Sequence, residues 1–170
     1  MARSYPDRVA SARPGEQTGR MARRLTRPRP TSLPRTIGRL ALGAMLAFAG
    51  TSHLTFARDD FRAQVPEWLP FDEDAVVLAS GFVEITLGGA LLVLGRKRVA
   101  VGWLVAAFFV AIFPGNISQL VTHTSAFGLD TDTKRAVRLI GQPLLVLLAL
   151  WSTGAWRDRQ ALRAQLTSSK

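Results

Sequence analysis

The chain has no cysteine among its 170 residues, and this absence excludes several kinds of chemistry at once. No disulfide, thiolate metal site or thiol nucleophile can form, so any redox chemistry needs a bound cofactor or a partner protein. Histidine is almost as scarce, since His53 and His123 are the only two. Because His123 falls in a polar loop, two facing axial histidines for a haem are lacking. A metal site built on His53 would also have too few ligands.

Other motifs that mark catalysis are missing as well. The chain has no nucleotide-binding glycine loop and no nucleophile elbow. Acidic residues are few, with 12 Asp and Glu against 22 Lys and Arg, which gives a formal net charge of +10. The length suffices for one compact unit and not for two. We therefore do not expect a self-contained enzyme.

Hydrophobic residues make up 48% of the chain, and they gather in long runs from which charge is almost excluded. Each run has about 21 to 23 residues, which as a helix spans roughly 30 Å, the thickness of a bilayer core. The pattern predicts an all-α fold, a transmembrane four-helix bundle over residues 36–156. Its expected helices are Thr36–Ala57, Ala75–Gly95, Val99–Val121 and Ala136–Trp156.

The two ends of the chain differ from this apolar part. Residues 1–35 hold nine arginines and five of the nine prolines, with no apolar periodicity, so they are predicted to form a disordered cytoplasmic arm. The arm is interpreted as a solvated tail that fixes topology; attraction to anionic lipid is an alternative, and nucleic acid is not favoured. Met21 is a second plausible start after Met1. Residues 157–170 form a basic cytoplasmic tail.

Lysine and arginine counts predict the orientation of the helices. The arm, the turn at 96–98 and the C-terminal tail carry nine, three and four basic residues, whereas the loops 58–74 and 122–135 carry two each. The loop 58–74 also holds six acids. Since basic residues stay on the cytoplasmic side, both termini should be cytoplasmic and both longer loops outside.

An alternative reading of the first apolar run is a cleaved signal peptide. Arginines precede the run, and Ala47-Phe48-Ala49 before Gly50 resembles a cleavage site, while Arg23-Arg24 faintly suggests a twin-arginine signal. Against cleavage, the apolar character continues to Ala57, and removal would leave His53 without a neighbouring helix.

One strongly polar residue interrupts each predicted helix: His53, Glu84, Asn116 and Gln142. Counting from the outer helix ends places them at depths of about 6 to 14 Å, Glu84 being the deepest. A polar side chain in hydrocarbon is costly, so these four should face the bundle interior and meet there. An acid at this depth should be protonated or paired, and His53 and Arg138 are its candidate partners.

Small residues predict close helix packing around this layer. Gly81, Glu84 and Gly88 share one helix face, and the first helix carries a second small face made of Gly43, Ala47 and Gly50. Pro114 and Pro143 adjoin Asn116 and Gln142, and each should bend or unwind its helix.

The loop before the second helix alternates aromatic and charged residues, which suggests a segment at headgroup level that roofs the cavity below or forms an ordinary aromatic belt. Its apolar members are Phe61, Val65, Trp68, Leu69 and Phe71.

Each polar residue also has a purely structural explanation. His53 can hydrogen-bond a neighbouring helix or face the outer headgroups, and Asn116 and Gln142 are typical interhelical contacts. Gln119 lies close enough to the outer boundary to be interfacial. Only for Glu84 does its depth favour a functional role.

In order and spacing, several short motifs resemble the DoxX family of small four-helix bacterial membrane proteins. They are His53, Val65-Pro66-Glu67-Trp68-Leu69-Pro70, Ser80-Gly81 with Glu84, Phe113-Pro114 with Asn116, and Gln142-Pro143. The resemblance covers residues 36–156. It implies a multi-pass protein of the bacterial inner membrane and a link to membrane redox complexes, oxidative stress and sulfur metabolism. The lack of cysteine argues against direct handling of sulfur.

Two functions remain open. One is an accessory subunit of a membrane redox system, holding a quinone or other small amphipathic ligand through His53, Glu84, Asn116, Gln142 and Arg138. Imidazole and amides donate hydrogen bonds to quinone oxygens, and a carboxylic acid provides a proton route. The other is a noncatalytic scaffolding bundle whose polar residues only lock helices together. A carrier has little support, since no inverted repeat is evident.

Overall fold

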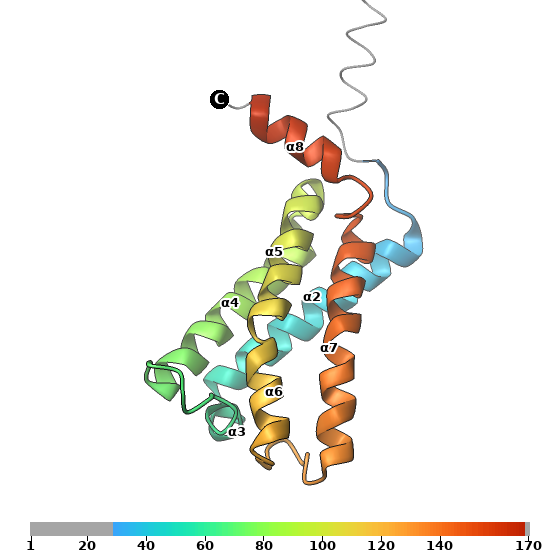
Figure 1. Ribbon diagram of the computed structural model, residues 1–170. Coiled ribbons are helices and arrows are strands. Elements are labelled where there is room, and N and C mark those ends of the chain that lie inside the picture. Colours follow the sequence, from blue (N-terminus) through green and yellow to red (C-terminus); the bar gives the residue numbers. More distant parts are fainter. Residues whose placement is uncertain (1–28, 169–170) are drawn as a thin grey trace, which may run out of the picture.

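The computed structural model describes residues 29–168, and every regular element in that range is a helix. The all-α prediction is therefore confirmed for this part of the chain. In chain order the elements are α2 (Leu33–Leu54), α3 (Arg58–Arg62), α4 (Glu73–Val93), the 3-10 turn η1 (Gly95–Lys97), α5 (Arg98–Ala111), α6 (Phe113–Val121), α7 (Asp132–Thr153) and α8 (Arg159–Ser168) (Figure 1).

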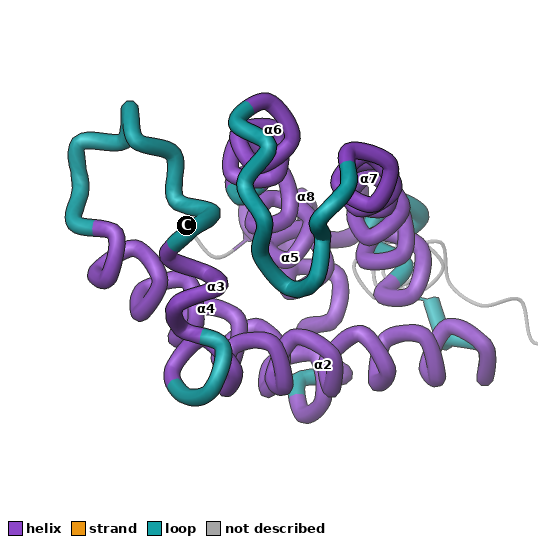
Figure 2. The backbone as a smooth tube through the Cα atoms, turned by 90° about the horizontal axis from the view of Figure 1, so that it is seen from below, coloured by secondary structure: helices purple, strands orange, loops and turns teal. Residues whose placement is uncertain are grey.

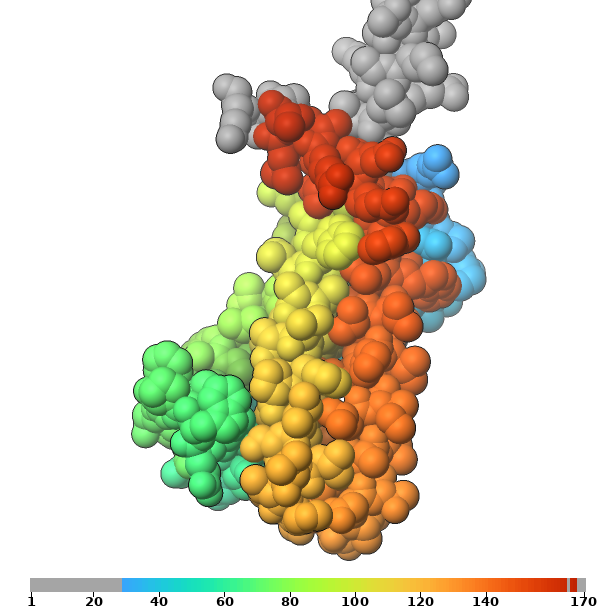
Figure 3. Space-filling view, viewed as in Figure 1, coloured from blue at the N-terminus to red at the C-terminus, as the bar shows by residue number. Residues whose placement is uncertain are grey.

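The long helices associate as two antiparallel pairs. α2 packs along α4, α5 packs along α7, and α2 also touches α7. Seen from below, α6 and α7 appear nearly end-on while α2 runs across the view, so α2 is strongly inclined to the second pair (Figure 2). α3 and the segment that follows it form a knob beside α6 at the end of the bundle opposite to α8 (Figure 3). The cavity described below lies at this end.

Three helical segments of the described chain are long and apolar enough to cross a membrane: Glu73–Val93, Gly95–Val121 and Asp132–Thr153. α2 is as long, at 22 residues, but it carries Arg39 and His53 and is not among these three. The helices expose large apolar side chains outward, a pattern that soluble monomers rarely show. Examples are Phe82 at 62%, Leu104 at 60% and Ile140 at 67% exposed.

The first, second and fourth predicted helices begin and end two to four residues earlier than their hydrophobic runs predicted, because caps set the boundaries. Pro34 occupies the first turn of α2, where a missing N–H costs nothing. The Asp72 carboxylate accepts from the Ala75 N–H and the Thr131 hydroxyl from the Lys134 N–H, so both following helices take in charged first turns. Gly154, at φ 70°, ends α7.

The two prolines have different outcomes. The third predicted helix is divided at Ile112 into α5 and α6, with Pro114 in the first turn of α6, so the predicted interruption is confirmed. Pro143 was expected to bend or unwind its helix, and it does not unwind it, since α7 continues through it. A helix stays continuous past a proline when its neighbours hold both halves, and α5, α6 and α2 all contact α7.

The predicted ends of the domain shift slightly. Residues 1–28 of the predicted arm lie outside the described residues, and Leu33–Arg35 belong to the first turn of α2 rather than to the arm. Most of the predicted tail forms α8, while residues 169–170 again lie outside the described part.

Glycines set the distance between α2 and α4, as the small-residue faces predicted. A Cβ added at Gly50 would lie 2.5 Å from the Gly81 carbonyl oxygen, and one at Gly88 would lie 2.7 Å from the Gly43 carbonyl oxygen. Backbones this close leave no room for a side chain. The seam continues into an apolar core made of Leu42, Leu46, Leu91, Val101, Val105, Ala106, Phe109 and Ala149.

A buried ionic cluster joins three segments at the end near α8. Asp158 is 5% exposed, and its Oδ2 lies 3.1 Å from Arg98 Nη2 and 2.9 Å from Arg157 Nη2. Both arginines also donate to the carbonyl of Arg29. Burial opposes ionisation of Asp158, but the hydrogen bond from Arg157 and the charges of both arginines hold its pKa below the ordinary value.

Candidate functional site

Two of the four predicted polar residues form a buried pair across the α2–α4 seam. His53 Nδ1 lies 3.0 Å from Glu84 Oε2, and the two side chains are only 6% and 8% exposed. The seam itself brings them together, since a Cβ at Gly81 would lie 2.8 Å from His53 Cβ. The expectation that Glu84 turns inward to a partner is confirmed, and that partner is His53.

The hydrogen bonding of this pair is incomplete. Although His53 Nδ1 and Glu84 Oε2 are close, neither atom makes a well-aligned hydrogen bond to any described residue. Buried polar atoms are nearly always satisfied, so two adjacent exceptions require an explanation. A ligand bound beside them is one such explanation.

The other two predicted residues form a second pair, between α6 and α7. Asn116 Nδ2 donates to Gln142 Oε1 at 2.8 Å, and Gln142 Nε2 donates to the Phe109 carbonyl at 2.8 Å. That carbonyl is in the last turn of α5, where the break at Ile112 leaves acceptors without helical partners. The two amides therefore hold the interrupted helix against α7.

Arg138 does not bind Glu84, which was its expected alternative partner. Its guanidinium donates to Gln119 Oε1 at 2.9 Å and to Gln64 Oε1 at 2.8 Å, and it lies over the Phe127 ring. Gln119 is 2% exposed, so the expectation of an interfacial side chain there is wrong. The charge of Arg138 makes burial of that amide favourable.

A cavity of about 250 Å³ lies beside the His53–Glu84 pair. Among the predicted ligand-binding residues, His53, Glu84, Asn116 and Arg138 line it, whereas Gln142 lies behind Asn116 and does not. The remaining lining residues are mostly apolar, which is typical of a small-molecule site. They are Phe61, Gln64, Val65, Pro66, Trp68, Leu69, Val76, Val77, Ser80, Ala111, Ile112, Pro114 and Gly115.

The loop after α2 covers this cavity, as one of the two interpretations of its aromatic pattern predicted. Phe61, Val65, Trp68 and Leu69 all line the cavity. The Phe61 ring also stacks edge-on against the His53 ring. This loop, residues 58–74, is called the roof below, and it contacts the ionisable pair directly.

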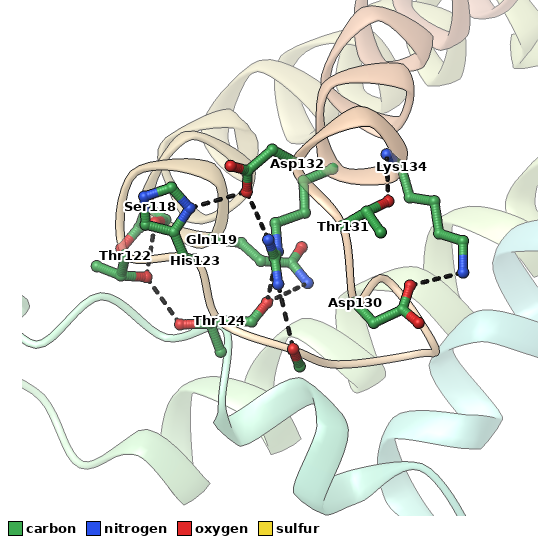
Figure 4. Close-up of polar contacts among 11 residues, drawn as sticks. Ser118, Gln119, Thr122, His123, Thr124, Asp130, Thr131, Asp132 and Lys134 are labelled. Carbon is green, nitrogen blue, oxygen red and sulfur yellow. Dashed lines mark hydrogen bonds and ion pairs between the residues drawn. The ribbon is translucent and has the colours of Figure 1, made fainter.

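Hydrogen bonds from Arg135 hold the α6–α7 loop in place next to the roof. Arg135, 5% exposed, donates to the Thr124 carbonyl at 3.1 Å, to Asp132 Oδ1 at 2.6 Å and to Ser125 Oγ at 3.1 Å. Figure 4 shows the exposed His123 turned toward Asp132 at the end of α6. These bonds close the loop across the ends of α6 and α7.

Phe127 connects this loop to the roof. Its ring stacks on Phe61 with centroids 4.5 Å apart, and its N–H donates to Asp60 Oδ1 at 3.3 Å. Phe127 adopts φ 55°, which is rare for a bulky residue and is kept only where surrounding contacts enforce it.

Sequence reasoning missed Gln64, Phe127 and the buried role of Gln119. A signal was present for Gln119, because it follows Asn116 by three residues and so shares its helix face. Arg138 precedes Gln142 by four residues, so these two side chains also share one helix face. Gln64 and Phe127 lie in loops, where no periodicity indicates direction.

The donor set favours a neutral or weakly polar organic group over a metal. Within residues 29–168, no group of three or more His, Asp or Glu side chains is placed to hold a metal ion. The cavity instead offers an imidazole, a carboxyl group, an amide and a guanidinium among apolar walls. Such groups donate and accept hydrogen bonds and can pass a proton.

Residues 42–155, more than half of the chain, match the model of a protein family described as Domain of unknown function (DUF8561). The chain belongs to this family. No curated protein matches the chain, and no solved structure matches it. The matched DUF8561 region runs from within α2 to just beyond α7, so it contains every residue that lines the cavity.

Proposed function

We propose that this DUF8561 protein is an integral membrane protein that binds the polar head of a small amphipathic molecule, such as a quinone, as an accessory subunit of a membrane redox system. The observation that carries the proposal is the buried His53–Glu84 pair. Both residues line a cavity of about 250 Å³, and their facing atoms have no well-aligned hydrogen bond.

The proposal places four helices across the bacterial inner membrane, with α2 as the fourth crossing. Its length and its outward-facing Ile37 and Phe48, 57% and 68% exposed, support this role. Both termini are then cytoplasmic, and the cavity lies near the outer surface. Since the chain has no cysteine, single introduced cysteines report topology without background. Ser125→Cys should react with an impermeant maleimide in intact cells, and Lys97→Cys should react only after lysis.

Quinone chemistry suits the groups that line the cavity. Reduction of a quinone takes up electrons and protons together, and the His53–Glu84 pair can hold and pass a proton next to the ring. The Arg138 guanidinium and Asn116 supply further polar contacts. Electrons must come from a partner, because no side chain of this cysteine-free chain is a redox centre. The resemblance to the DoxX family supports a redox partner.

A scaffolding bundle is the second candidate, and one observation favours it. Asn116, Gln142 and the Phe109 carbonyl form a closed set of hydrogen bonds that leaves Gln142 no role in the cavity. This is how polar residues join helices without binding anything. The two candidates differ in what they require of Glu84.

Glu84→Gln separates the candidates because it keeps the size of the side chain and removes its charge and proton. We expect this variant, purified in mild detergent, to bind menadione at least about tenfold more weakly, the loss of roughly 1.4 kcal/mol. Its thermal unfolding should stay near that of the parent protein. Glu67→Gln, the same change in the exposed part of the roof loop, is the matched control and should bind as the parent does.

The scaffolding candidate predicts the reverse. Glu84→Gln would then lower the unfolding temperature, and neither the parent nor the variant would bind menadione. Mass spectrometry of molecules that copurify with the native protein gives an independent readout. A retained quinone or dehydrogenase subunit supports the redox assignment.

A further inference from the structure

We infer that the ligand reaches the cavity sideways from the outer leaflet, past Trp68 and Pro114, and that its apolar tail stays in lipid against Ala111 and Pro114. This inference rests on the proposed function and adds the class of ligand: a quinone or similar ring that carries a long apolar chain.

Cavity size gives the first argument. Pockets that enclose a drug-sized molecule have about 300 to 1,000 Å³, and this cavity has about 250 Å³. It can hold a ring and cannot also hold a prenyl or acyl chain. A ligand of the membrane that binds here must therefore leave its tail outside.

Exposure shows where the tail can leave. Of the residues that line the cavity, only Trp68, Ala111 and Pro114 are exposed, whereas His53, Glu84 and Asn116 are buried. Ala111 and Pro114 lie within one turn of each other at the break between α5 and α6. The open side of the cavity is therefore at this break, next to the roof.

This open side faces lipid rather than water. Ala111 and Pro114 lie inside Gly95–Val121, one of the three segments that are apolar enough to cross a membrane. Exposed side chains within such a segment are the ones that acyl chains cover. A passage between them consequently leads into hydrocarbon.

A shallow groove extends the passage toward the outer end of α6. It is lined by Ile117, Ser118, Val121 and Thr122, and it shares Trp68 and Pro114 with the cavity. Amphipathic rings reside at headgroup level, where Trp68 also lies in the proposed orientation. A ring can thus move along this groove and under Trp68 without crossing water.

The test compares two alanines on one helix face. Ala111→Trp fills the opening, and Ala107→Trp places the same ring one turn away, at an exposed position that does not line the cavity. We expect Ala111→Trp to weaken binding of prenylated menadione at least about tenfold in nanodiscs, while Ala107→Trp leaves it unchanged. In Ala111→Trp, tail-less menadione should lose less affinity than prenylated menadione, because only the prenylated ligand needs the opening for its tail. Ala107→Trp should bind both ligands as the parent does, since Ala107 does not line the cavity.

A second measurement does not depend on any variant. Prenylated menadione with a diazirine at the end of its tail should label lipid-facing residues of α4 and the α5–α6 segment. Equal effects of both tryptophans, or labelling confined to the loop 122–131, would overturn the lateral route while leaving a binding site in place. Failure of tail-less menadione to bind the parent protein would instead refute the proposed function.

Discussion

Gly88→Ala should destabilise the bundle through a single methyl group. The added carbon would lie 2.7 Å from both Ala47 N and the Gly43 carbonyl oxygen, and 3.2 Å from Ala47 Cα. All three are backbone atoms, so no side chain can rotate away to make room. The two helices themselves would have to separate.

The required separation sets the magnitude. Ordinary van der Waals contact begins near 3.4 Å, which exceeds 2.7 Å by about 0.7 Å. A gap of 0.5 to 1 Å already loses roughly a quarter to a half of the dispersion energy of each facing atom pair. Overpacked positions typically cost about 1 to 3 kcal/mol.

Gly89→Ala is the matched control, because a Cβ at Gly89 meets nothing within 4 Å. Both substitutions gain about 0.5 to 1 kcal/mol of helix propensity, and this gain cancels when the two variants are compared. Gly88→Ala should therefore be less stable than Gly89→Ala by about 1 to 3 kcal/mol, measured by reversible unfolding in mixed micelles. Equal stabilities would refute the close backbone contact of α2 and α4.

Three further predictions concern the polar contacts. Gln142→Leu should destabilise the protein, because the Phe109 carbonyl and Asn116 lose their partner, and a double-mutant cycle with Asn116→Leu should give a coupling of about 0.6 to 1.7 kcal/mol. Because the pKa of Asp158 is held below its ordinary value of about 3.9, its stabilising charge is present above that pH and is lost as the pH falls through the folded value. Asp158→Asn should thus make unfolding less sensitive to acid, and an unchanged acid transition would contradict this account. Arg135→Met should release the α6–α7 loop to limited proteolysis, since it removes charged hydrogen bonds worth about 1.5 to 3 kcal/mol each. Lys134→Met should have a smaller effect, because its bonds to Gly128 and Asp130 in the same loop are exposed to water.

The sequence was informative about the polar layer for two reasons. A polar side chain in an apolar run costs free energy unless it points inward, and small residues recur at helical spacing beside it. An acid such as Glu84 in a long apolar run is costly unless it points away from lipid, so its inward direction could be predicted. His53 was one of its two predicted partners. The glycines at positions 43, 50, 81 and 88 predicted the seam between α2 and α4, since the two glycines of each helix lie on one face of it. What could be predicted was therefore the contact between two regular elements.

Other contacts depend on geometry that no pattern encodes. Whether Arg138 would pair with Glu84 or with amides was undetermined, because a long side chain reaches several partners at once. The Asp158 cluster was missed although Asp158 is the only acid after Asp132, since a lone acid in a basic tail is usually solvated. Helix boundaries shifted because caps, rather than hydrophobicity, determine them.

The break at Ile112 divides the third long helix into two halves that are held by different contacts. The inner half is locked by Gly102, which lies so close to Thr153 that no side chain would fit between them. The outer half, which begins at Phe113, is held against α7 by the Asn116–Gln142 hydrogen bond and supplies Pro114 and Asn116 to the cavity. The apolar core takes Val101, Val105, Ala106 and Phe109 from the inner half alone. One long helix therefore divides its work, because residues past the break shape the cavity and residues before it build the core.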